Sequence, residues 1–174
     1  NIQSGKLEVW PGMSLSDVLS LAEDGDEIVI ADPGLYDQQT VVIDKSVTIL
    51  GPNAGVSATD PNRQTEARFS QGFEILAPNV TIDGIRIQST IGTSNGIELA
   101  SGATGTLIKN TVIRGSFAEN GLAGSHGVLG RGQAKFDNVS LRNWSSAGLI
   151  YEGELTFDDC TVSDNRSGFT LQSE

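Results

Sequence analysis

The feature that most constrains this chain is an internal repeat. When residues 80–88 (VTIDGIRIQ), 106–114 (TLIKNTVIR), 134–142 (AKFDNVSLR) and 155–163 (LTFDDCTVS) are aligned without gaps, their apolar positions coincide. A repeat of roughly 20 to 50 residues is typical of a chain whose units bury their apolar faces only by stacking on one another. Equivalent strands would then recur once per unit and stack in parallel, about 4.8 Å apart.

One column of this repeat predicts a turn. Gly84, Asn110, Asn138 and Asp159 share it, and Gly51 belongs there too. These three residue types are the ones that tolerate a left-handed backbone conformation. We therefore expect a corner at each of these positions. The two asparagines lie on consecutive units, and we expect their amides to bond to each other as an asparagine ladder.

A second series of short strands precedes the first, and each of its members opens with glycine. Alternating side chains within these strands would point in and out of the coil. Each unit thus contains three short strands, which indicates a coil rather than a meander of hairpins. The series comprises GFEI (72–75), GIEL (96–99), GVLG (127–130), GLIY (148–151) and GFTL (168–171). Its outward column reads Glu74, Glu98, Leu129, Ile150 and Thr170.

These units resemble the coils of right-handed parallel β-helix proteins of the pectin-lyase-like superfamily, of the bacterial secreted or surface type. Residues 25–55 and the run R-F-S-Q-G-F-E-I-L-A-P-N-V-T-I-D-G-I-R-I from Arg68 carry the resemblance. It implies an all-β fold, a right-handed β-solenoid of about six coils. A helix predicted over 14–25, with Ser14 or Ser16 as its N-cap, resembles the N-terminal cap of that family.

The chain is long enough for one domain with its own core. No C-terminal cap follows the last coil, which begins at Gly168. We therefore expect a fragment of a longer chain, or another subunit that covers this coil. The expected domain spans 1–174, with an N-terminal strand and capping helix in 1–26, coils in 27–174, and loop insertions at 52–70 and 116–126.

Charge and composition argue against several classes of partner. The chain has 22 acidic and 11 basic residues and a net charge of -11, so a nucleic-acid backbone would be repelled. No apolar run approaches the roughly 20 residues of a membrane span. Cys160 is the single cysteine. It excludes an internal disulfide and a zinc site of several thiolates, and it lies in a predicted core column.

Two groups of residues are candidates for catalysis or metal binding. His126 is the best catalytic candidate, with Arg131 beside it, because histidine transfers protons near neutral pH. Glu74 and Glu98 could bind Ca²⁺ or act as an acid–base pair, or they could be a solvated strand face. The acidic runs of the chain lack the spacing of known calcium loops. We therefore predict no cofactor and no metal site, with calcium as the open alternative.

Arg114 and Arg142 are candidates for ligand binding, because they align on adjacent units with Arg86 nearby. Two neighbouring guanidinium groups repel unless an anion joins them. A uronic-acid carboxylate could be that anion, although Asp137 and Asp158 are close enough in sequence to pair internally.

The sequence favours a non-catalytic structural or recognition module of a secreted or cell-surface bacterial protein, located outside the cell and binding acidic or neutral polysaccharide. The alternative is an enzyme domain, a lyase, epimerase or hydrolase that acts on acidic polysaccharide. A second alternative is a segment of a phage tailspike or fibre. That alternative requires apolar outward columns, for which Leu107, Val112, Leu129 and Ile150 are the candidates.

Overall fold

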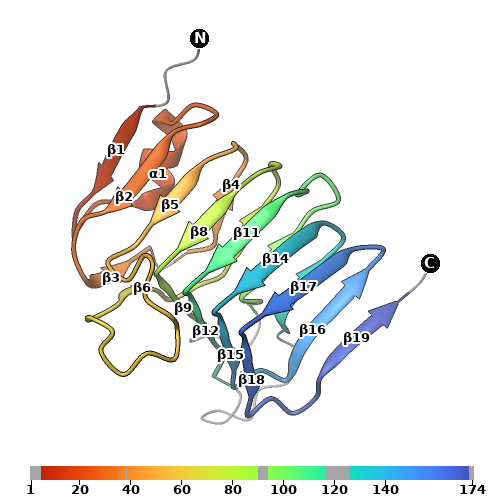
Figure 1. Ribbon diagram of the computed structural model, residues 1–174. Helices are drawn as coiled ribbons and strands as arrows, with labels where there is room; N and C mark the ends of the chain where they lie inside the picture. The colour runs from red at the N-terminus through yellow and green to blue at the C-terminus, as the bar shows by residue number, and fades with distance from the viewer. Residues whose placement is uncertain (1–4, 38, 90–93, 117–125, 173–174) are drawn as a thin grey trace.

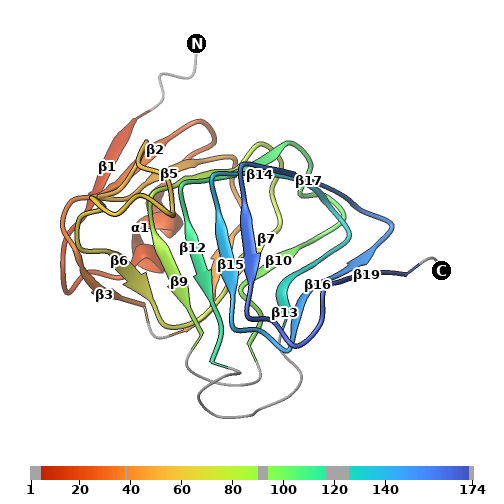
Figure 2. The same ribbon diagram turned by 60° about the horizontal axis from the view of Figure 1, so that its bottom comes forward.

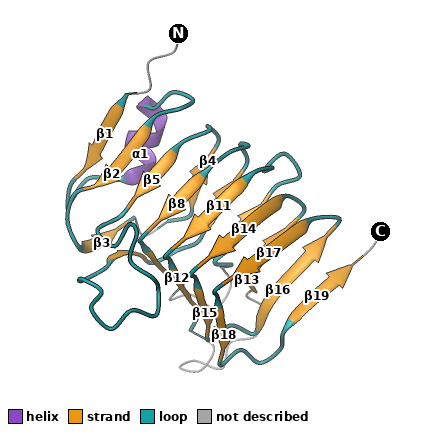
Figure 3. Cartoon of the chain, viewed as in Figure 1, coloured by secondary structure: helices purple, strands orange, loops and turns teal. Residues whose placement is uncertain are grey.

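The computed structural model describes residues 5–37, 39–89, 94–116 and 126–172. The chain forms a parallel β-solenoid of about six turns, with its two ends at opposite ends of the stack (Figure 1). Every strand pairs in parallel with the equivalent strand of the next turn, as the repeat predicts. The turns build three sheets, and Figure 3 shows that strands and their connecting loops make up nearly all of the chain.

The first sheet has seven strands in the order β1-β2-β5-β8-β11-β14-β17. It contains the aligned repeat: Ile82 pairs with Ile108, which in turn pairs with Phe136. The register predicted from the sequence is therefore confirmed. The strands are β1 (Lys6–Val9), β2 (Glu27–Ile30), β5 (Thr48–Leu50), β8 (Thr81–Asp83), β11 (Thr106–Lys109), β14 (Gln133–Asp137) and β17 (Glu154–Asp158).

The second sheet has six strands in the order β19-β16-β13-β10-β7-β4. Glu98 pairs with Glu74 on one side and with Leu129 on the other, so the predicted glycine-led strands do stack. The strands are β4 (Val41–Ile43), β7 (Phe73–Ile75), β10 (Ile97–Leu99), β13 (His126–Gly130), β16 (Ser146–Tyr151) and β19 (Phe169–Gln172).

The third sheet has six strands in the order β18-β15-β12-β9-β6-β3, and its strands face the viewer in Figure 2. Ile113 pairs with Ile87 and with Leu141, which continues the aligned repeat across this sheet. The strands are β3 (Gly34–Tyr36), β6 (Ala67–Phe69), β9 (Arg86–Gln88), β12 (Val112–Arg114), β15 (Ser140–Arg142) and β18 (Thr161–Ser163).

The core fills the interior between the three sheets with mostly aliphatic side chains. Ile82, Ile87 and Ile113 are fully buried, as their columns predict. Trp144 is fully buried as well, and its indole Nε1 donates to the carbonyl of Ile113 at 3.2 Å. Burial decreases toward the last turn, where the side chain of Leu171 is 79% exposed.

The predicted turn column adopts the left-handed conformation. The φ angles of Gly84, Asn110, Asn138 and Asp159 are 77°, 47°, 54° and 47°. Gly51 falls in this column as predicted, because Leu50 pairs with Asp83, but it does not share the left-handed conformation. Glycine is required at position 51 because the neighbouring turn packs closely against it. A Cβ at Gly51 would lie 2.4 Å from the carbonyl oxygen of Gly84.

The asparagine ladder takes a different form from the one predicted. The Asn110 amide donates to the Asp83 carboxylate at 2.7 Å, and the Asn138 amide donates to Asp137 at 2.9 Å. The amides therefore bond to carboxylates rather than to each other. A carboxylate is the stronger acceptor. Asp137 directly precedes Asn138, whereas Asp83 lies on the turn before Asn110 and pairs with Lys109.

The single helix, α1 (Leu15–Leu21), lies beside the first turns of the solenoid (Figure 3). Ser14 is its N-cap, and the Ser14 hydroxyl accepts a hydrogen bond from the Asp17 amide at 3.3 Å. The helix ends earlier than predicted, because Ala22 is already extended. Leu15, Val18 and Leu19 are buried in the common core, so the helix packs on the solenoid through one apolar face.

The outward column of the second sheet differs from the prediction by one residue. Leu149, not Ile150, pairs with Leu129 and Thr170, and Ile150 points inward with 3% of its surface exposed. The sequence alignment matched Gly148 with the preceding glycine, whereas in the structure Gly148 pairs with Val128. A shift of one residue exchanges the two faces of a strand.

Candidate functional site

The two glutamates of the second sheet lie side by side on its outward face. Glu74 and Glu98 pair directly across β7 and β10, and the next outward residues are Leu129 and Leu149. The Asn95 amide donates a hydrogen bond to the Glu98 carboxylate. Within the described ranges, no group of three or more His, Cys, Asp or Glu side chains is arranged to hold a metal ion.

His126 lies at the start of β13, next to Asn95 of the preceding turn. The Asn95 side-chain oxygen accepts from the His126 backbone amide at 2.9 Å and lies 3.3 Å from the imidazole Nδ1. Burial lowers the pKa of His126, while the nearby Glu98 charge opposes that shift. The structure thus connects His126, Asn95 and Glu98 in one chain of contacts. Sequence analysis missed Asn95, which carries no motif of its own.

Arg131, the second catalytic candidate, lies directly after β13, and its guanidinium carbon is 5.6 Å from the centre of the Tyr151 ring. Arg131 therefore lies at the opposite end of β13 from His126. The two side chains are not neighbours, although they are only five residues apart in the sequence. In an extended strand, five residues span about 16 Å.

The arginines form a row of like charges on the third sheet. Arg114 and Arg142 are direct neighbours on β12 and β15. Arg86 pairs with Arg68 on one side and with Val112 on the other. All four arginines alternate with buried inward residues and so lie on the outward face of the third sheet. They come from β6, β9, β12 and β15, which are consecutive strands (Figure 2).

Burial and repulsion both act on this row. Burial lowers the pKa of Arg86, and the positive charges of Arg114 and Arg142 lower it further, while Glu66 opposes the shift. The Nε atoms of Arg86 and Arg142 are buried and have no hydrogen-bond partner among the described residues. The size of such repulsion follows from Coulomb's law. Two like unit charges about 8 Å apart repel by about 2 kcal/mol at an effective dielectric constant of about 20.

In the described part of the chain, Asp137 and Asp158 contact residues other than these arginines. Asp158 forms an ion pair with Lys135 at 3.2 Å, and Asp137 accepts from Asn138. Both aspartates belong to the first sheet, not to the third. The corner between the two sheets separates them from the arginine row, because the turn column redirects the chain after each aspartate.

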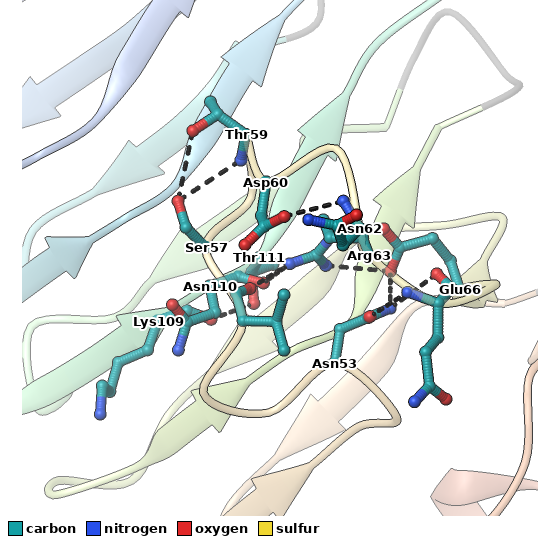
Figure 4. A network of polar contacts seen from close by, with 12 residues as sticks. Asn53, Ser57, Thr59, Asp60, Asn62, Arg63, Glu66, Lys109, Asn110 and Thr111 are labelled. Atoms are coloured by element: carbon teal, nitrogen blue, oxygen red, sulfur yellow. Dashed lines mark hydrogen bonds and ion pairs between the residues drawn. The ribbon is translucent and has the colours of Figure 1, made fainter.

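The predicted insertion at 52–70 was too long, because Ala67–Phe69 form β6 and Ala67 and Phe69 are buried in the core. The loop itself spans residues 51–66, between β5 and β6, and it packs on the turn column. Arg63 makes two hydrogen bonds to the Glu66 carboxylate, at 2.9 and 3.0 Å, and one to the Asn110 carbonyl oxygen at 3.0 Å (Figure 4). It also donates to the Val56 carbonyl oxygen. The Arg63 side chain is 8% exposed and that of Glu66 15%.

Other contacts tie the same loop to two further turns. The Gly55 amide donates to Asp83 at 3.1 Å, and the Ala58 amide donates to the Asn138 carbonyl oxygen at 3.1 Å. Asn53 is fully buried, and its side chain bonds Gln64 and Glu66 (Figure 4). The loop is therefore a structural brace across three turns. Most of the other predicted insertion, 116–126, lies outside the described residues.

Comparisons with known proteins add no relationship: no protein-family model, no curated protein and no solved structure matches this chain. No helix in the described part of the chain has the length and apolar character needed to cross a membrane. The features that bear on function are therefore the outward faces of the second and third sheets.

Proposed function

We propose that this chain is a non-catalytic recognition module of a secreted or cell-surface bacterial protein, located outside the cell, and that it binds polysaccharide on the outer faces of a stiff solenoid. The observation that carries the proposal is the arginine row of Arg68, Arg86, Arg114 and Arg142. A chain with a net charge of -11 has gathered four cations on one face. Guanidinium groups bind carboxylates and other oxyanions through paired hydrogen bonds.

The acidic face supports a non-catalytic role. Along the stack, the described outward residues after Glu74 and Glu98 are Leu129 and Leu149, so this column itself continues with neither an acid nor a cation. A lyase or epimerase needs a base and a group that stabilises the developing anion. Arg131 is the arginine that follows a strand of this sheet, and it stacks on Tyr151 at the end of β13 opposite His126.

The test is binding and turnover measured on the same polysaccharides. We expect the wild-type protein to be retarded in affinity gels that contain uronic-acid polymers, and Arg114→Gln with Arg142→Gln to reduce the retardation at least tenfold. Chain length and unsaturated products, followed by chromatography and absorbance, should stay unchanged for hours. Product formation, or equal retardation of the double variant, would contradict the proposal.

An enzyme acting on acidic polysaccharide is the second candidate, and the contacts of His126 favour it. With Nδ1 bonded to Asn95, the imidazole would present a neutral Nε2 as a proton acceptor, which is the form that its lowered pKa favours. In this case His126→Gln abolishes product formation and leaves binding intact. Asn95→Ala should lower the rate less, because it removes only the orienting contact.

We further propose the finer features of the fold that the resemblance implies. These are a right-handed, pectin-lyase-like β-helix, α1 as its N-terminal cap, and a last turn covered in the native assembly by more of the chain or by another subunit. The exposed apolar side chains of Phe169 and Leu171 support the covering of that turn. Sedimentation across concentration tests it. Leu171→Lys should reduce association, whereas Leu21→Lys, equally exposed at 77%, should not.

A further inference from the structure

We propose that Arg86, Arg114 and Arg142 form a binding site for one tetrahedral oxyanion, a sulfate or phosphate group. The inference rests on the proposed recognition function and deepens it by naming the chemistry of the ligand. Three consecutive turns each contribute one guanidinium group, from β9, β12 and β15. The site therefore exists only in the stacked fold.

The register brings the three side chains to one place. Arg114 and Arg142 are paired residues, so their backbones are about 4.8 Å apart. Arg86 pairs with Val112, two residues before Arg114 on the same face. Val112 and Ser140, which share this outward face, are only 4% and 6% exposed. The outward face between the arginines is thus closed to solvent.

The polar atoms of the site are incompletely satisfied. The Nε atoms of Arg86 and Arg142 are buried without a hydrogen-bond partner among the described residues. A buried donor without a partner is costly, and guanidinium groups do not lose their protons in proteins. No described residue supplies an acceptor to these two Nε–H groups, and an oxyanion bound among the arginines would supply one.

The carboxylates nearby do not supply that acceptor. Glu66, whose charge reaches Arg86, is held by two hydrogen bonds to Arg63. Asp158 pairs with Lys135 on another sheet. A sulfate or phosphate group has more oxygens than a carboxylate, and phosphate carries more charge as well. It can accept from several donors at once, which suits guanidinium groups from three neighbouring strands.

The compact charge of the site also limits the ligand. The rest of the chain is acidic, since its net charge is -11. A long nucleic-acid backbone would extend over repelling surface. A single anionic group, either free or carried as an ester on a glycan, places its charge only on the arginines.

The experiment is calorimetric titration of the whole chain with sodium sulfate and with inorganic phosphate, at constant ionic strength balanced by chloride. We expect saturable binding at one site. Arg86→Gln and Arg142→Gln should each weaken it at least tenfold, and Arg142→Lys should weaken it less because the charge remains. Lys135→Gln, an exposed cation of the first sheet, is the matched control and should bind as the wild type does.

Circular dichroism establishes that each variant is folded. Each glutamine variant removes one repelling charge, so we expect none of them to unfold the protein. The absence of saturable binding to the folded wild type would overturn the proposal. Equal affinity of the arginine variants and the wild type would also overturn it.

A second series of titrations identifies the source of the anion. A sulfated uronate disaccharide that binds more tightly than free sulfate, and more tightly than its desulfated form, supports a glycan ester as the ligand. Equal affinity for free sulfate and the disaccharide supports a free anion, and then the site stands while glycan recognition fails. If glycan binding is unchanged in all arginine variants, the proposed anion site is wrong. Glycan recognition would then take place on another face of the solenoid.

Discussion

Asn110 shows how one side chain meets two requirements at a corner of the solenoid. Its φ of 47° requires a residue that tolerates the left-handed region. Its amide also donates to the buried carboxylate of Asp83, which is 7% exposed and accepts from the Gly55 amide as well. Glycine would meet only the first requirement, and alanine would meet neither.

Two substitutions of Asn110 separate these requirements. Asn110→Gly should lower the free energy of unfolding by about 1.5 to 3 kcal/mol, because a hydrogen bond to a carboxylate is lost. Asn110→Ala should cost about 1 to 2 kcal/mol more, because the left-handed conformation strains a Cβ. Urea denaturation measures both. If the glycine variant is as stable as the wild type, the amide does not stabilise the corner.

His126 should make stability depend on pH in a defined direction. Its pKa in the folded chain lies below the ordinary value of 6.5 because burial disfavours the charged ring. As the pH falls below 6.5, the unfolded chain therefore binds the proton first, and the folded state loses stability. Above pH 6.5 this contribution is constant.

The difference in unfolding free energy between the wild type and His126→Gln isolates this effect, because the other titrating groups cancel. The difference should fall, to the disadvantage of the wild type, as the pH decreases from 7.5 to 5. The NMR titration of the imidazole should give a pKa below 6.5. A pKa above 6.5 would mean that Glu98 dominates over burial.

Among the elements, the loop of residues 51–66 behaves as a part of the core rather than as a free connection. Arg63 and Glu66 form its central ion pair, nearly closed to solvent. Removing one partner of such a pair leaves the other charge buried, which typically costs about 3 to 5 kcal/mol. Replacing both partners with apolar residues is much less harmful.

We therefore expect Arg63→Ala to destabilise the protein by about 3 kcal/mol or more, and Arg63→Met combined with Glu66→Leu to cost clearly less. Lys109→Ala is the matched control. Lys109 is 37% exposed and lies 3.9 Å from Asp83, so its loss should cost less than about 1 kcal/mol. Thermal unfolding compares the three proteins, and equal losses for Arg63→Ala and Lys109→Ala would show that the loop is not braced by this pair.

The elements also show what a sequence can predict in a repeat. The columns through Ile82 and Ile87 were predictable, because the aligned segments are of equal length. The outward column failed at Ile150, because β16 is longer than its neighbours and a glycine match placed it one residue off. The carboxylate partner of Asn110 and the contact between His126 and Asn95 were not predictable. They depend on side-chain directions at corners, which no periodicity specifies.

At the scale of the whole molecule, stability should vary along the stack. Each turn contacts only the turns beside it, so a solenoid behaves nearly as a one-dimensional chain of units. The last turn has neighbours on one side, and Val162, Phe169 and Leu171 are 43%, 39% and 79% exposed. Opening from this end costs the least apolar burial.

Amide hydrogen exchange should report this gradient. We expect the protected amides of β17, β18 and β19 to exchange at least tenfold faster than those of β8 and β11, under conditions where exchange occurs by partial opening. Leu171→Lys should leave the exchange of the central strands unchanged. Uniform exchange rates along the stack would indicate that the protein unfolds only as one cooperative unit.

The brace formed by the 51–66 loop has a mechanical consequence. It contacts the turns that contain Asp83, Asn110 and Asn138, whereas ordinary coils are joined only to their neighbours. Under a load applied at the C-terminal end, the turns beyond Asn138 would peel away singly. The peeling would then arrest where the loop holds three turns together, and further extension would require them to yield as a block. The solenoid would thus lengthen under load and still keep its first coils folded.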